Sequence, residues 1–243
     1  MAGSVKSMAV VAAFAVTALA GCDSTQQKNA RAELRAKREL GSRELPAATR
    51  RNPHVRVVRV ALVRGRAGSG AIVVKLRGTG SKPLTDVPIA VGVRGRDGQS
   101  RLVNAKRHLN WFQTHVPAIP ADGTVTWVYK GVRDLKAGDR AFAKVGVPLR
   151  PALSSASSLP QIDAVPAPGR NAKRRVSVEN VSDVPQYGLQ VYAFAQQGER
   201  YVAAGKTEIE HLGTGQQVTV AVPLTGSARK RPLRVEAIPT MFE

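Results

Sequence analysis

From His54 onward, apolar and polar residues alternate with a period of two, in short runs separated by turn residues. Val87, Ile89, Val91 and Val93 share one face of such a run, and Asp97-Gly98 follows it as a hairpin-turn pair. Similar runs surround Leu76, Trp127, Val145, Val178, Leu189, Val220 and Val235. Side chains two residues apart lie on the same face of a β-strand. The pattern therefore predicts an all-β fold built from β-sandwiches.

The runs form two groups, which predict a basic β-sandwich domain over 54–150 and a second one over 161–243. The prolines and serines of 151–160 predict a linker between them. At a constant shift of 102 residues, Leu76 falls on Val178, Pro83 on Pro185 and Ile89 on Val191. The two domains are therefore expected to be tandem copies of one module, with about ten extra residues in the first copy within 104–119.

Residues 22–53 are predominantly polar and basic, and they predict a flexible tether. Ala30 to Leu45 could form a short helix, but Leu34, Leu40 and Leu45 do not make a full apolar stripe, and Pro46 ends any helix. The alternative is a basic amphipathic segment that lies on anionic lipid.

The first 21 residues have the layout of a secretory signal. Lys6 precedes an apolar segment of twelve residues, Met8 to Leu19, which falls short of the ~18–20 needed to span a bilayer. The tetrapeptide Leu19-Ala20-Gly21-Cys22 resembles the lipobox of bacterial lipoproteins. That resemblance implies removal of 1–21, a diacylglycerol on Cys22, and anchoring at the extracytoplasmic face of a bacterial membrane. An ordinary signal peptide is the alternative.

Two equivalent segments resemble bacterial immunoglobulin-like extracellular modules of the FxLYD and CARDB kinds. They are 78–84 (Gly-Thr-Gly-Ser-Lys-Pro-Leu) and 179–185 (Glu-Asn-Val-Ser-Asp-Val-Pro). The FxLYD tetrad itself is absent, because 91–94 and 192–195 carry other residues. The resemblance implies the immunoglobulin-like fold class only, in modules that generally act as spacers or binding units.

The net charge of +20 is concentrated in the first predicted domain, where 54–150 hold eighteen Lys and Arg against five Asp, a net +13. Basic domains often bind nucleic acid, but an exported protein meets phospholipid headgroups and anionic surface polymers instead. We therefore expect no nucleic-acid partner. The alternative is that the charge only keeps the domain soluble.

No pattern of catalytic or metal-binding residues stands out, so the sequence predicts no enzyme, no metal and no cofactor apart from the lipid. The four histidines have no ligand spacing and are expected in loops or on the surface, and there is no G-x-S-x-G. Cys22 is the only cysteine, which leaves no partner for an internal disulfide.

The candidate contact residues are arginines and one aromatic pair. The arginines, suited to phosphate or carboxylate, are Arg56, Arg59, Arg64, Arg66, Arg94 and Arg96. Trp111 and Phe112 would add an exposed contact, or else plug the sandwich core. We expect a non-catalytic, lipid-anchored binding or scaffolding protein that contacts another envelope component. The alternative is a binder of anionic polymer, glycan or phospholipid headgroups through the first domain.

Overall fold

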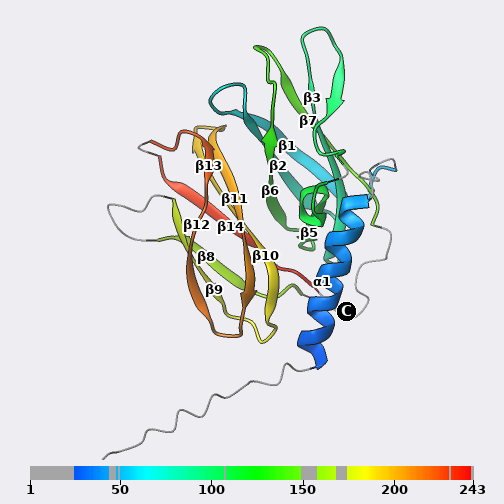
Figure 1. Ribbon diagram of the computed structural model, residues 1–243, viewed down its shortest axis with the longest axis vertical. Coiled ribbons are helices and arrows are strands. Elements are labelled where there is room, and N and C mark those ends of the chain that lie inside the picture. Colours follow the sequence, from blue (N-terminus) through cyan, green and yellow to red (C-terminus); the bar gives the residue numbers. More distant parts are fainter. Residues whose placement is uncertain are drawn as a thin grey trace, which may run out of the picture.

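The computed structural model describes residues 25–43, 48, 50–106, 108–148, 158–167, 174–229 and 231–241. The predicted signal peptide, Cys22 and most of the predicted linker lie outside these residues. The elements in chain order are α1 (Thr25–Arg43), β1 (Val55–Arg64), β2 (Gly70–Gly78), β3 (Leu84–Arg94), β4 (Ser100–Leu102), α2 (Trp111–Thr114), β5 (His115–Ile119), β6 (Thr124–Val132), β7 (Arg140–Val145), β8 (Ile162–Pro166), β9 (Arg175–Asn180), β10 (Gln186–Gln197), β11 (Arg200–Leu212), β12 (Gln217–Ala221), β13 (Leu224–Gly226) and β14 (Leu233–Ile238). Figure 1 shows their arrangement.

The N-terminal pair of sheets follows directly from the period-two pattern. One sheet has the order β1-β2-β6, and in the other β3 pairs with β4, β5 and β7, all antiparallel. Ile72, Val74 and Leu76 of β2 lie on one face and belong to the same buried cluster as Ile89 and Val91 of β3. The predicted all-β sandwich fold is confirmed.

The C-terminal pair of sheets has the same strand order. Its smaller sheet runs β12-β9-β8, and in its larger sheet β10 lies between β11 and β14, with β13 added beyond β11. Thus β8, β9 and β12 correspond to β1, β2 and β6, while β10 and β14 correspond to β3 and β7. Val176 and Val178 pack against Leu189 and Val191 in a second buried cluster.

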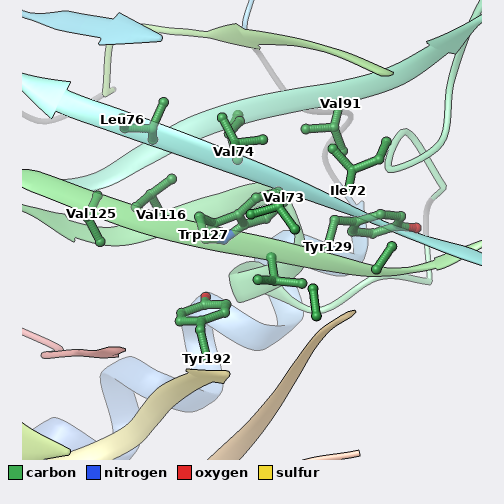
Figure 2. Close-up of a cluster of buried hydrophobic side chains, with 14 of the residues drawn as sticks. Ile72, Val73, Val74, Leu76, Val91, Val116, Val125, Trp127, Tyr129 and Tyr192 are labelled. Carbon is green, nitrogen blue, oxygen red and sulfur yellow. The ribbon is translucent and has the colours of Figure 1, made fainter. Parts of the chain in front are cut away.

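The two pairs of sheets pack face to face, so that β1-β2-β6 and the β10 sheet form the two middle layers (Figure 1). Tyr192, Phe194 and Tyr201 of the β10 sheet belong to the same buried cluster as Val73 of β2. Figure 2 shows Tyr192 reaching toward the side chains of β2 and β6. Both faces of β2 and β10 are therefore covered, since Ala71–Val74 and Gln186–Ala195 are buried without alternation.

Polar side chains also lie in this interface. The Glu236 carboxylate of β14 accepts hydrogen bonds from the Thr126 backbone N–H at 2.6 Å and from the Thr126 hydroxyl at 2.7 Å. The Lys206 ammonium of β11 is buried and has no hydrogen-bond partner. Burial lowers the pKa of Lys206 to about 8, which Glu208 opposes and Lys130 reinforces. Lys206 is therefore a buried cation in the interface, and its burial costs stability.

Helix α1 occupies most of the segment for which the sequence predicts a flexible tether. Ala30 and Leu34, one helical turn apart, are buried against Trp111, Phe112 and Tyr187. The helix approaches β10 closely at Gly188, which has φ +62° and where an added Cβ would lie 3.0 Å from Leu34 Cδ1. The helix has no full apolar stripe, but its two buried apolar residues contact a cluster of aromatic side chains. These contacts dock a mostly polar helix.

The Leu34→Ala variant should weaken the docking of α1. Removing a buried leucine contact costs about 2 kcal/mol or more, which corresponds to a roughly thirtyfold faster hydrogen exchange of α1 amides by local opening. Exchange followed by mass spectrometry measures this directly. The matched control is Arg35→Ala, because Arg35 is exposed. Equal protection of α1 in the Leu34 variant and in the wild-type protein would contradict this docking.

Candidate functional site: an arginine-lined cleft

A cleft of about 1030 Å³ lies between the β1–β2 turn and the loop that joins β13 to β14. We call it the arginine cleft. Five exposed arginines line it, namely Arg64, Arg66, Arg174, Arg229 and Arg231. Among the residues that the structure describes, no Asp, Glu or aromatic side chain contributes to the lining. The remaining lining residues are glycines, small hydroxyl-bearing residues, one alanine and two leucines. The cleft therefore presents positive charge, with no carboxylate among its described lining residues to neutralise it.

Two glycines allow the two sides of the cleft to come together. Gly226 at the end of β13 has φ +85°, and a Cβ there would lie 2.8 Å from Val63 Cγ1 of β1. At Gly65, an added Cβ would lie 3.0 Å from Thr225 Cγ2. The end of β1 and the turn after it therefore lie against Thr225 and Gly226 of β13, at the same end of the molecule (Figure 1). The cleft exists only because the two pairs of sheets pack face to face.

Backbone carbonyl groups orient two of the arginines. Arg64 Nη2 donates to the Asp139 carbonyl oxygen at 3.2 Å, and Arg174 Nη1 donates to the Leu224 carbonyl oxygen at 3.4 Å. A guanidinium group carries five N–H donors. One such bond therefore positions the group and leaves other donors able to contact an anion.

Carboxylates near this end of the first pair of sheets serve its turns. Asp97 Oδ1 accepts from the Gln99 backbone N–H at 3.0 Å, and Asp139 Oδ2 accepts from the Lys136 backbone N–H at 2.9 Å. Aspartate commonly plays this role in tight turns. These contacts pair the two side chains with backbone donors, so neither depends on an arginine for a hydrogen bond.

The structure brings only two of the predicted arginines, Arg64 and Arg66, into the cleft. Arg59 instead lies between the two pairs of sheets, 3.5 Å from a Glu199 carboxylate oxygen and 5.8 Å from the centre of the Tyr201 ring. Arg56 lies at the opposite end of β1 from Arg64, where it lines a smaller pocket. Arg94 and Arg96 belong to the β3–β4 hairpin, where Arg94 Nε donates to Ser100 Oγ at 3.1 Å. The six predicted arginines therefore lie at separate places in the structure, and the sequence left open whether they form one patch.

Of the two alternatives for Trp111 and Phe112, the structure shows burial and not an exposed contact. Their exposed fractions are 8% and 2%, because α1 covers them. Trp111 Nε1 donates to Asp86 Oδ1 at 3.2 Å, and its ring stacks on His115 with centroids 3.6 Å apart. His115 is itself buried, contrary to its predicted place in a loop or on the surface. The pair thus has a packing role.

Three arginines of the cleft were missed by the sequence reasoning: Arg174, Arg229 and Arg231. All three come from the half of the chain whose net charge is small. The net charge of that segment therefore does not indicate a basic site. The signal available was local, since two arginines lie within three residues after Gly226-Ser227-Ala228. Their meeting with Arg64 depends on sheet packing, which the local pattern does not encode.

No group of three or more His, Cys, Asp or Glu side chains in the described parts of the chain is arranged to hold a metal ion. Within the same described parts, neither helix combines the length and the apolar character required to cross a membrane. No protein-family model and no curated protein matches the chain. Function is therefore inferred from the side chains of this protein.

Proposed function

We propose that this protein is a non-catalytic, lipid-anchored binding protein of the bacterial cell envelope, whose arginine cleft binds an anionic envelope component. The cleft supports this proposal, because five arginines line it and none of its described lining residues is a carboxylate. Guanidinium groups form strong, charge-assisted and often bidentate bonds with phosphate and carboxylate. The anchor rests on the lipobox-like tetrapeptide that ends at Cys22.

The sequence leaves two kinds of envelope partner open. The first is a protein, and the second is an anionic polymer or a lipid headgroup. The charge of the cleft favours the anionic partner, as do the short side chains between the arginines. We further propose that the two pairs of sheets are tandem immunoglobulin-like modules, for which their matching strand orders give support. In this view the second module contributes arginines to the site as well as serving as a spacer.

A salt titration of binding tests this function. The protein is residues 22–243 with Cys22→Ser, which keeps every described residue. The probes are phosphatidylglycerol vesicles, inorganic polyphosphate and polygalacturonate. The double variant Arg229→Ser/Arg231→Ser should bind its preferred probe about tenfold more weakly near 50 mM salt, with a log–log salt slope lower by roughly 1.5.

The matched control is Arg94→Ser/Arg96→Ser, which removes the same charge outside the cleft lining. This variant should retain nearly all of the affinity and the salt slope. Equal losses in both double variants would mean that only the total charge matters, and the cleft would not be the site. Absence of binding to all three probes at low salt would refute the proposed function.

A further inference from the structure

The size of the arginine cleft argues against a single small anion as its ligand. A volume of about 1030 Å³ is roughly that of thirty liquid water molecules, far more than one tetrahedral phosphate fills. The five arginines also come from separate segments: the end of β1, the β1–β2 turn, the residue before β9, and the β13–β14 loop. Charges spread around a wide cleft fit a ligand that carries several anionic groups in succession.

The other lining residues restrict the chemistry of this ligand. Sugar rings and nucleobases usually bind through aromatic side chains on which they stack, and no described lining residue is aromatic. A polyhydroxylated ligand also needs acceptors for its hydroxyl hydrogens, which carboxylates supply best, and none is present among the described lining residues. Thr225 and Ser227 instead contribute hydroxyl donors to the lining, whereas the Ser69 hydroxyl already donates to the Arg66 carbonyl oxygen at 2.6 Å. The lining is thus rich in donors and suits a ligand that consists almost wholly of acceptors.

Building on the proposed function, we infer that the arginine cleft binds a linear phosphate chain, with successive phosphate groups contacting arginines from both pairs of sheets. Phosphate provides several acceptor oxygens and a high charge density, which match the fork of a guanidinium group. A chain of such groups also offsets the mutual repulsion of five neighbouring cations. Carboxylate polymers built on sugar rings carry the necessary charge. However, the described lining offers neither the aromatic side chains on which sugar rings stack nor the carboxylates that accept hydrogen bonds from their hydroxyl groups.

Calorimetric titration of residues 22–243 carrying Cys22→Ser tests this inference with four probes. They are long-chain inorganic polyphosphate, orthophosphate, polygalacturonate, and phosphatidylglycerol vesicles, compared at equal anionic charge. We expect saturable binding of polyphosphate that is at least tenfold tighter than binding of each other probe. Arg66→Ser/Arg229→Ser, which removes one arginine from each side of the cleft, should weaken it at least tenfold, while Arg94→Ser/Arg96→Ser should leave it within twofold.

Each contrary outcome has a separate meaning. Equal affinity for polygalacturonate overturns the phosphate inference and leaves the proposed binding of an anionic component in place. Tight binding of vesicles alone assigns the cleft to lipid headgroups and overturns the inference of a linear phosphate chain. Equally tight binding of orthophosphate overturns the need for successive phosphate groups. Absence of binding to all four probes overturns this inference and the proposed function together. Thermal unfolding of each variant, measured in parallel, shows that a loss of binding does not reflect a loss of folding.

Discussion

Replacing Gly226 with alanine is expected to destabilise the protein by about 4 kcal/mol and to abolish anion binding in the arginine cleft. The backbone at Gly226 has φ +85°, a conformation that costs an L-residue roughly 1–2 kcal/mol. The added Cβ would also collide with the Val202 carbonyl oxygen and lie 2.8 Å from Val63 Cγ1. That carbonyl group accepts a hydrogen bond from the Ser227 backbone N–H at 3.0 Å, so relief of the collision would displace the cleft loop.

Urea unfolding measures the loss of stability, and a matched glycine separates its two causes. Gly198, in the β10–β11 turn, has φ +56°, and an added Cβ would meet no heavy atom within 4 Å. Gly198→Ala therefore carries the backbone strain alone, at about 1 kcal/mol. If Gly226→Ala costs no more than Gly198→Ala, the close approach of β13 to β1 is refuted.

Replacing Lys206 with methionine is expected to stabilise the protein by about 3 kcal/mol at neutral pH. The Lys206 ammonium is buried without a hydrogen-bond partner, beside the buried Tyr192 and opposite Lys130. A folded-state pKa of about 8, against 10.5 for the free side chain, corresponds to that free-energy cost at about 1.4 kcal/mol for each unit of pKa. Methionine keeps the apolar stem and removes the charge.

The pH dependence of this effect has a definite sign. Below pH 8 the amine is protonated in both the folded and the unfolded states, so the full cost is present. Between pH 8 and 10.5 the folded state loses its proton first, and the wild-type stability rises toward that of the variant. Urea unfolding at pH 7 and at pH 10 should therefore show a gain that shrinks by more than half. The control, Lys144→Met at an exposed site of β7, should show little gain at either pH, and an equal gain there would contradict the explanation.

Much of the fold could be predicted because the strands that bury one face carry a period-two pattern. Val176 and Val178 of β9, which alternate with the less buried Ser177 and Glu179, show this pattern. The packing of the sheet pairs was harder to predict, although a signal existed. Residues 71–74 and 191–195 are continuous apolar runs, and such runs are typical of strands covered on both faces. Interpreted as strands with one buried face, these runs predict two domains joined by a linker and leave the packing of one pair of sheets on the other unpredicted.

The candidate site was only partly predictable, for a related reason. Arg64 and Arg66 could be predicted because they belong to a basic strand and the loop that follows it in the basic domain. Arg174 and Arg231 reach the same cleft through the packing of one sheet on another, which depends on contacts between residues far apart in the chain. The position of Arg59 could not be predicted from the local sequence, because its ion-pair partner, Glu199, lies 140 residues away.

If Cys22 carries the proposed lipid, the docked helix α1 also limits how far the protein can move from the membrane. A lipid on Cys22 would be joined to Thr25, the first residue of α1, by a reach of at most ~11 Å. A flexible linker of about 30 residues would give the cleft access to a large volume above the membrane. This would lower the effective concentration of the cleft at any one point of the surface. With α1 held on Trp111 and Tyr187, the anchored protein explores a much smaller volume. It would therefore favour ligands that lie close to the bilayer over those that extend deep into the envelope.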